Sequence, residues 1–223
     1  MTVAAVIPAA GRGERLGAGR PKALVEVAGR TLLEHAVDGI RPVAELIVVA
    51  VPADLVEQVR SLLTDVEVVA GGEVRQDSVR AALARLPADV DIVLVHDAAR
   101  AWVPVDVSRR VVQAVRNGAD AVIPVVAVTD TVKEVESGGE VVRTVDRTGL
   151  RCVQTPQGFR RDVLVRAHSA GATGAGATDD AGLVEALGLT VVTVQGSAEA
   201  FKVTTPFDLE VARALMTSRS AGV

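Results

Sequence analysis

Residues whose types and spacing suit phosphate binding gather near the N-terminus. The apolar segment Val3–Ile7 runs into a short loop that contains Gly11, Gly13 and Arg15, and Lys22 follows soon after. Such a loop can present backbone N–H groups and fixed positive charge to a polyphosphate. Lysine is a compact point charge and arginine a planar fork. Because the chain has only three lysines among its 24 basic residues, Lys22 indicates a place where a point charge is needed.

The loop differs from two better-known phosphate-binding loops. A Walker A loop would need Gly-Lys-Ser/Thr at a fixed distance from a first glycine, and the chain lacks that run. A dinucleotide fingerprint would need Gly or Ala where this chain has Leu16. What remains is a loop long enough to wrap a triphosphate, with Arg15 and Lys22 to neutralise it; the alternative is an ordinary strand–helix connection.

A carboxylate follows another apolar segment, Asp91–His96. Asp97 at the end of a strand could meet Mg²⁺ or a ribose hydroxyl, because Mg²⁺ needs only one or two carboxylates besides phosphate oxygens. Arg100 could hold a phosphate or form a local ion pair, and the sequence does not choose between them. His96 has no partner in sequence and favours a structural role. The sequence has no His/Cys metal cluster and no Gly-x-Ser-x-Gly elbow, which disfavours a zinc site or a serine hydrolase.

Alternating strand and helix patterns must position these residues. Together they imply right-handed βαβ units and an α/β fold with a doubly wound, mostly parallel, Rossmann-like sheet. Ligands of such sheets bind outside the carboxyl ends of the strands, so the Gly11 loop, the Gly71-Gly72 turn and Asp97 should share one edge. The strands are expected at Val3–Ile7, Leu46–Val51, Val66–Ala70, Ile92–His96 and Ala121–Val126. The helices are expected at Leu32–Ile40 with a capping box from Thr31 and Glu34, Asp54–Leu63, Ser78–Leu86 and Val107–Arg116.

A β-hairpin is expected where this rhythm changes. Thr131–Glu136 and Glu140–Val145 alternate apolar and polar residues on either side of a Ser-Gly-Gly turn. The hairpin has too little apolar surface for its own core, so it should project as an arm and pack against a second subunit. We therefore expect residues 1–223 to form one domain with an arm inserted at about 130–147, and the protein to be a homodimer. Beyond the arm we expect strands at Leu150–Gln154 and Thr190–Val194, helices near Arg161–His168 and Ala181–Leu187, a mobile loop at Gly171–Gly176, and a last helix with Thr205 as N-cap and Pro206 at its first position.

Composition limits the function classes. Of the 223 residues, 49% are hydrophobic but only 2% aromatic, which suits a buried parallel sheet and disfavours stacking on nucleic-acid bases. The net charge of −4 argues against general binding of nucleic acid or membrane surfaces. The single cysteine, Cys152, excludes an intrachain disulfide, lies in an apolar strand where we expect it to be buried, and favours a cytoplasmic location. We expect no membrane span and no signal peptide.

The motifs resemble those of sugar-phosphate nucleotidyltransferases. The N-terminal loop has Pro8-Ala9-Ala10-Gly11-x-Gly13-x-Arg15-Leu16 followed by Pro21-Lys22, which looks like the signature of that superfamily. The further motifs, in order, resemble the 2-C-methyl-D-erythritol 4-phosphate cytidylyltransferase family over nearly the whole chain. They are Gly71-Gly72-x-x-Arg75-x-x-Ser78-Val79, His96-Asp97-Ala98-Ala99-Arg100, Asp130-Thr131-Val132-Lys133, Thr144-Val145-Asp146-Arg147, Thr155-Pro156-Gln157-x-Phe159, Thr178-Asp179-Asp180 and Lys202-Val203-Thr204.

The resemblance implies a reaction and a site. The reaction would transfer CMP from CTP to 2-C-methyl-D-erythritol 4-phosphate, with Mg²⁺, in the non-mevalonate pathway to isoprenoid precursors. Arg15 and Lys22 would be catalytic. The nucleotide would contact Pro8, Ala9, Ala10, Gly11, Gly13, Gly72, Glu73, Ser78, Asp97 and Ala98. The acceptor would contact Thr131, Arg147, Lys202, Asp97 and Arg100, with Thr131 and Arg147 reaching a neighbouring subunit's site, and Asp97 would be the metal ligand.

The chain departs from the family pattern at Ala23, where Gln is frequent, and at Ala101-Trp102, where Pro is usual. These departures put the fine positioning of the site residues in doubt.

Two other interpretations of the function stay open. A cytidylyltransferase for another polyol phosphate, such as ribitol 5-phosphate, would share the Gly loop and differ in its acceptor contacts. A catalytically idle nucleotide-binding subunit would be expected to have lost Arg15, Lys22 or Asp97, and all three are present.

Overall fold

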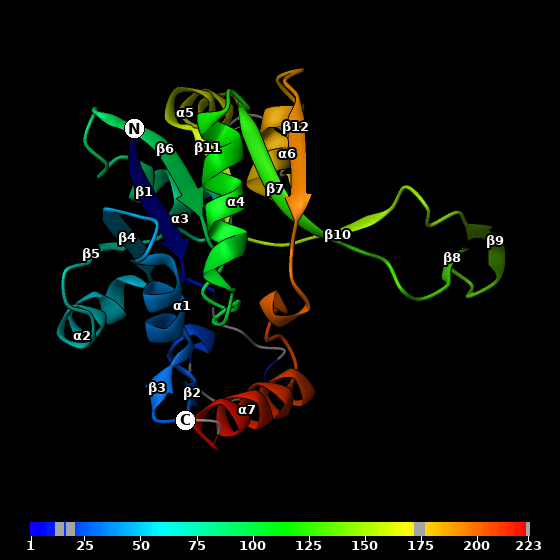
Figure 1. Ribbon diagram of the computed structural model, residues 1–223, viewed down its shortest axis with the longest axis horizontal. Coiled ribbons are helices and arrows are strands. Elements are labelled where there is room, and N and C mark those ends of the chain that lie inside the picture. Colours follow the sequence, from blue (N-terminus) through cyan, green and yellow to red (C-terminus); the bar gives the residue numbers. More distant parts are fainter. Residues whose placement is uncertain (12–15, 17–20, 172–176, 222–223) are drawn as a thin grey trace.

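A twisted sheet with helices on both faces forms the centre of the computed structural model (Figure 1), which describes residues 1–11, 16, 21–171 and 177–221, with side chains up to Thr217. The strand order is β10-β7-β11-β6-β1-β4-β5, and β12 pairs with β7. The strands of this sheet are β1 (Thr2–Pro8), β4 (Leu46–Val51), β5 (Glu67–Ala70), β6 (Val90–Val95), β7 (Ala121–Ala127), β10 (Arg151–Val153), β11 (Gln157–Arg160) and β12 (Val191–Gln195).

Helices cover the sheet because its strands are apolar on both faces. In β1, Val3, Ala5 and Ile7 pack with residues of α1, α2 and α4, whereas Ala4 and Val6 pack with residues of α3, α5 and α6. This alternation follows from the two-residue period of a strand. The helices are α1 (Leu32–Ile40), α2 (Val56–Leu62), α3 (Arg75–Leu83), α4 (Val105–Arg116), α5 (Arg161–Ala170), α6 (Asp180–Glu185) and α7 (Pro206–Ala221), with short 3-10 turns η2 (Lys22–Leu24), η3 (Ala53–Leu55) and η5 (Ala198–Ala200).

The expected α/β architecture is confirmed, and most of the expected elements lie within a few residues of their predicted ends. Pairs β1–β4, β1–β6, β4–β5 and β12–β7 are parallel. The capping box of α1 forms: Glu34 N–H donates to Thr31 Oγ1 (3.1 Å), and Thr31 N–H donates to Glu34 Oε2 (2.7 Å). Thr205 caps α7 in the same manner, since its Oγ1 accepts from Asp208 N–H at 3.2 Å.

The expected arm is a separate two-stranded sheet of β8 (Val132–Val135) and β9 (Val141–Val145). It projects from the body of the molecule beyond β7 and β10 (Figure 1). Val135, Val141 and Val142 are more than half exposed on it. The arm therefore carries apolar surface that the rest of this chain does not cover.

Three features differ from the expectations. Strand β11 was not predicted, yet it lies between β6 and β7 and is antiparallel to both. A small hairpin of β2 (Glu26–Val27) and β3 (Arg30–Thr31) was also missed. Cys152 is exposed rather than buried, because β10 is an edge strand that pairs with β7 alone.

In the part of the chain that the structure describes, no helix is long and apolar enough to span a bilayer.

Candidate active site

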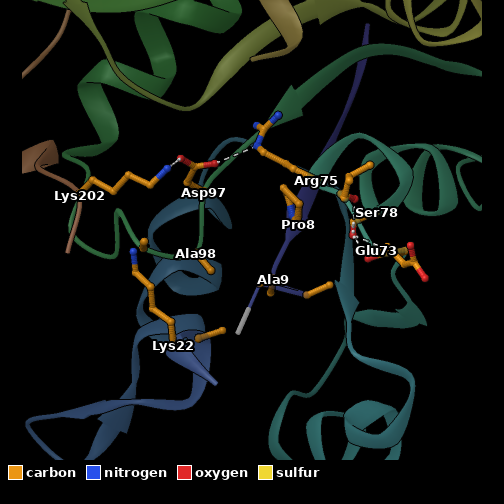
Figure 2. A pocket seen from close by; sticks show the side chains of 15 residues that line it. Pro8, Ala9, Lys22, Glu73, Arg75, Ser78, Asp97, Ala98 and Lys202 are labelled. Carbon is orange, nitrogen blue, oxygen red and sulfur yellow. Dashed lines mark hydrogen bonds and ion pairs between the residues drawn. The ribbon is translucent and has the colours of Figure 1, made fainter. Parts of the chain in front are cut away.

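A pocket opens at the carboxyl ends of β1, β5 and β6, where the fold predicts a ligand. Its volume is about 690 Å³ when the space open to solvent at its mouth is included, which is within the range of small-ligand sites. Figure 2 shows Lys22 and Lys202 on one side, Glu73 and Ser78 on the other, and Pro8 and Ala9 between them. Its lining residues are Pro8, Ala9, Ala10, Gly11, Lys22, Ala23, Gly72, Glu73, Val74, Arg75, Ser78, Asp97, Ala98, Ala99 and Lys202.

A glycine turn after β5 forms one wall and leaves no room for side chains. Gly71 N–H donates to Val51 O at 2.7 Å, which continues the pairing of β4 and β5. A Cβ atom at Gly71 would lie 2.7 Å from Ser78 Oγ and 2.8 Å from the Cβ of Ala10. Gly72 N–H donates to Ser78 Oγ at 3.2 Å. Because no side chain fits at this close approach, the turn presents backbone groups at the pocket wall, and the buried Ser78 hydroxyl supports it.

Asp97 is the buried anion of the pocket, and two cations hold it. Its Oδ2 lies 2.7 Å from Lys202 Nζ, and its Oδ1 lies 3.4 Å from Arg75 Nε (Figure 2). Burial alone would raise the pKa of Asp97, but the charges of Arg75 and Lys202 outweigh it and hold that pKa far below its usual range. Asp97 is therefore a fixed carboxylate at every physiological pH.

Two lysines on separate elements bring positive charge to the pocket. Lys22 begins the 3-10 turn η2, directly after Pro21, whose fixed φ suits the start of the turn. Lys202 lies in an extended segment that Val203 anchors, because Val203 is fully buried and its N–H donates to Ala99 O at 2.9 Å. Anionic groups of a ligand would therefore meet charge from both η2 and the segment before α7.

His96 supports Asp97 from the interior. Thr155 Oγ1 lies 3.0 Å from His96 Nδ1 and accepts from the Asp97 N–H at 3.0 Å. The hydroxyl has one O–H and two lone pairs, so it can donate to Nδ1 of a neutral imidazole while it accepts from Asp97. Burial lowers the pKa of His96 to about 4, in part opposed by the charge of Asp97. His96 thus has the structural role that the sequence favoured, and Thr155 is a support that sequence reasoning did not assign.

The buried His96 predicts a loss of stability in mild acid. The unfolded chain takes up the His96 proton at a pKa near 6.5, whereas the folded protein does so at about 4. The unfolded state binds more protons between these values, so the free energy of unfolding should fall as the pH drops through this window, by on the order of 3 kcal/mol. Urea denaturation of the wild type and of His96→Asn across this range measures it. A slope as steep in the variant as in the wild type would contradict the assignment.

The pocket contains a carboxylate that could serve as the protein ligand of a hard divalent cation. In the described ranges, no three acidic, histidine or cysteine side chains gather to form a protein-only metal cage. Mg²⁺ commonly takes one or two carboxylates and draws its other ligands from phosphates and water. Asp97 can supply one such ligand, although Arg75 and Lys202 already contact its two oxygens.

Most of the sequence-predicted site residues line this one pocket. Arg100 does not: its guanidinium donates to Ala200 O at 2.7 Å and Val153 O at 3.0 Å, and so ties the turn after Asp97 to two other segments. Thr131 and Arg147 are exposed at the base of the arm and do not line the pocket either. Gly13 and Arg15, and residues 172–176 of the expected mobile loop, lie outside the described part of the chain.

Arg75 is the main pocket residue that sequence reasoning left without a role. It begins α3 and lines the pocket between Asp97 and a second carboxylate, Asp180. Its position in the Gly71-Gly72-x-x-Arg75 motif was the available signal. Nothing in the sequence indicated that Asp180 would lie beside it, since the two residues are 105 positions apart.

The geometry defines a class of protein before any comparison is made. Two lysines bring positive charge to one side of the pocket, and a glycine turn lines the other side. Phosphoryl chemistry needs little beyond positioning and neutralisation of charge. A doubly wound sheet with this pocket at its carboxyl edge is the architecture of a nucleotidyltransferase.

Comparison with known proteins identifies the family. The model of the 2-C-methyl-D-erythritol 4-phosphate cytidylyltransferase family matches residues 3–218, and the chain belongs to this family of nucleotidyltransferase enzymes. Relatives of that name from Frankia casuarinae and Saccharopolyspora erythraea are 56% and 55% identical, over 96% and 97% of this chain and 81% and 100% of theirs. The crystal structure of that enzyme from Thermus thermophilus has a TM-score of 0.84 and 40% identity, covering 96% of this chain and 98% of the other.

Proposed function

We propose that this pocket transfers CMP from CTP to 2-C-methyl-D-erythritol 4-phosphate, giving 4-diphosphocytidyl-2-C-methyl-D-erythritol and pyrophosphate. An oxygen of the acceptor phosphate attacks the α-phosphorus of CTP. As the new P–O bond forms, the bond to the oxygen bridging the α- and β-phosphorus breaks, and pyrophosphate leaves with that electron pair. The observation that carries the proposal is the convergence of Lys22, Lys202 and Asp97 on one pocket in a chain of this family.

Each wall of the pocket has a part in this reaction. The Gly72 turn and Ser78 contact the cytosine, where a small pocket favours a pyrimidine, and Glu73 lies at the same wall. The backbone of residues 8–11 lies along the nucleotide, and Ala98 lies beside Asp97. Lys22, with Arg15, stabilises negative charge on the phosphates as it shifts during transfer, and Lys202 binds the acceptor phosphate. In-line positioning of this kind can supply much of the rate enhancement.

Asp97 is assigned one of two contacts. It contacts the ribose or a divalent cation, which we propose to be Mg²⁺. A cation bound there with the triphosphate would neutralise part of its charge. Asp97 itself stays ionised because Arg75 and Lys202 hold it, so it accepts from a hydroxyl or binds a cation without first losing a proton.

The substrate assignment is tested by pyrophosphate release across a grid of four nucleoside triphosphates and two acceptors, each with Mg²⁺. Release with CTP and methylerythritol phosphate alone is the expected result. Release with CTP and ribitol 5-phosphate would move the acceptor assignment to another polyol phosphate, although the names of the relatives favour methylerythritol phosphate. No release in any well would support the idle-subunit alternative.

We further propose that the arm completes the site of a second copy in a homodimer. Within one chain, Thr131 and Arg147 flank the two strands of the projecting arm and do not line the pocket. The exposed valines of the arm, Val135, Val141 and Val142, give a partner an apolar surface to cover. Arg147 is exposed, and its Nη1 reaches a backbone carbonyl only at 3.4 Å, so its guanidinium can bind a phosphate from another copy.

Arg147→Ala is expected to raise the KM for the acceptor by about tenfold or more while the CTP dissociation constant stays nearly unchanged. Loss of a charged hydrogen bond to the acceptor phosphate accounts for that size. Steady-state kinetics and CTP calorimetry measure the two quantities. Arg143→Ala is the matched control, because Arg143 is exposed on the same arm and pairs with Glu134. Loss of CTP binding in Arg147→Ala would refute the location.

Mixing two impaired variants, assayed at an acceptor concentration well below the wild-type KM, tests whether the arm acts on its partner. If Arg147 acts across the dimer, a mixed dimer of Lys22→Ala and Arg147→Ala chains contains one site with both residues intact. Each mixed dimer that forms when the two variants are refolded together should then have up to about half the activity of a wild-type dimer. If mixing restores none, Arg147 serves its own chain.

A further inference from the structure

Arg75 joins the nucleotide pocket to a buried carboxylate behind its wall. Its Nε lies 3.4 Å from Asp97 Oδ1, and its Nη1 lies 2.6 Å from Asp180 Oδ2. The Arg75 side chain is 30% exposed and lines the pocket, whereas Asp180 is fully buried. Burial would lower the pKa of Arg75, but the charges of Asp180 and Asp97 outweigh it and raise that pKa. One guanidinium therefore spans the distance from the ligand site to the interior.

A histidine holds Asp180 on its other side. His168 Nε2 lies 2.9 Å from Asp180 Oδ1, and both side chains are buried. An ionised carboxylate only accepts, so the imidazole donates from Nε2. Within the described residues, His168 Nδ1 is buried and has no hydrogen-bond partner. The contact with Asp180 is thus the one polar interaction that fixes this ring among the residues the structure describes.

The segment that carries Asp180 is tied to two neighbouring elements. Gln157 of β11 accepts from Ala181 N–H at 3.2 Å and donates to Asp179 Oδ2 at 2.7 Å. Gln76 of α3 donates to Ala177 O at 3.2 Å. Gln157 is itself buried in the sheet. Because these bonds hold its backbone, Asp180 is a fixed point to which the longer, flexible Arg75 side chain must conform.

The local signals at the start of α3 do not explain this placement. Arg75 in the first turn opposes the helix dipole, whereas Asp77 in the same turn favours it. Val74, the N-cap of α3, makes no side-chain capping bond. Positions that break local rules are expected at functional sites, and here two carboxylates from distant parts of the chain offset the unfavourable start.

We propose that Asp180, held by His168, is a positioning residue that fixes Arg75 and, through it, orients Asp97 for the nucleotide. Arg75 takes one oxygen of Asp97 and Lys202 takes the other, so the carboxylate has one orientation while Arg75 is in place. Without Asp180, Arg75 has no partner behind the wall and can follow Asp97 or turn into the pocket. This inference rests on the proposed function, because that function assigns Asp97 to CTP.

A double-mutant cycle on CTP binding, read by calorimetry, tests the proposal without any acceptor. Asp180→Asn and Arg75→Gln should each weaken CTP binding by about tenfold, the size of one charged hydrogen bond. If Asp180 acts through Arg75, the double variant should bind CTP no more weakly than Arg75→Gln alone. Multiplied effects in the double variant, or unchanged affinity in Asp180→Asn, would overturn the proposal.

Matched variants separate positioning from a general loss of structure. Thr31→Ala removes the N-cap of α1, whose Oγ1 accepts from Glu34 N–H at 3.1 Å, and Thr31 does not line the pocket. It should lower the melting temperature yet leave CTP affinity within about twofold; a loss equal to that of Asp180→Asn would overturn the proposal. His168→Leu should weaken CTP binding, and His168→Gln, which keeps a donor near the position of Nε2, should restore much of it. Failure of the wild type to bind CTP would overturn the proposed function and this inference with it.

Discussion

A Lys22→Ala variant is expected to turn over about 10²–10³-fold more slowly than the wild type, while its affinity for CTP changes by less than about tenfold. A fixed charge accelerates the reaction only where it binds the transition state more strongly than the substrate. Lys22 stands in the pocket on η2, opposite the glycine turn that we assign to the base (Figure 2). Pyrophosphate release gives the turnover number, and calorimetry gives the CTP dissociation constant.

Two further variants make the Lys22 result specific. Lys133→Ala removes a lysine from the arm, where Lys133 donates to Thr144 Oγ1 at 2.6 Å and lies outside the pocket, so it should retain turnover. Lys22→Arg keeps the charge but replaces a compact ammonium with a planar fork, so it should recover only part of the activity. Equal losses in turnover and CTP affinity for Lys22→Ala would remove its role in the transition state.

Asp97→Asn is expected to lower kcat/KM for CTP by about 10²-fold. An amide offers one acceptor oxygen and one NH₂ group, so either Arg75 or Lys202 would face another donor. Loss of one preorganised electrostatic contact in an active site commonly costs on the order of 10²-fold in rate. Steady-state kinetics at varied CTP, together with thermal unfolding to show that the variant is folded, measure the effect.

Asp91→Asn is the control for Asp97→Asn, because Asp91 lies on the same strand at the opposite end. Asp91 Oδ2 accepts from Thr2 N–H at 2.8 Å, far along β6 from the pocket. Its replacement should leave kcat/KM unchanged. If Asp97→Asn kept wild-type kcat/KM, Asp97 would be a structural anion only, and its assignment to the ribose or to a cation would be withdrawn.

The central part of the fold could be predicted from the sequence because its signals are local. Val-rich segments such as Leu46–Val51 are apolar on both faces, and they alternate with amphipathic stretches. Leu32–Ile40, with Thr31 and Glu34 before and within its first turn, is an example in which the predicted and observed bounds agree. Strand–helix alternation then restricts the topology to a doubly wound sheet.

Strand β11 could not be predicted because its signals are tertiary. It contains Gly158 and ends in Arg160, so it lacks the apolar run of its neighbours. Its glycine is required by packing: a Cβ atom there would lie 2.4 Å from Val111 Cγ1 on α4. Strand β11 is short, and its position depends on the strands and helices that surround it. Its sequence therefore has no periodic pattern of its own.

The residues of the candidate site also fall into two groups, those that motifs in the sequence indicate and those that only the fold brings together. Lys22, Asp97 and Ser78 could be proposed from motifs, since Lys22 opens a turn, Asp97 follows a strand, and Ser78 belongs to the motif that begins at the Gly71-Gly72 turn. Arg75 and Asp180 could not be joined, because their contact depends on the antiparallel return of the chain through β11 to α6. The arm residues Thr131 and Arg147 remain predictions, as their assigned contacts belong to a second copy.

The most direct test of CMP transfer at this pocket follows the α-phosphate of CTP. The wild-type protein, CTP labelled at the α-phosphorus, methylerythritol 4-phosphate and Mg²⁺ are incubated, and the products are separated. We expect the label to move into the diphosphocytidyl product in step with pyrophosphate release, and Lys22→Ala and Asp97→Asn to slow this transfer by about 10²-fold or more. Label that remains in CTP, or that appears as free CMP, would contradict it.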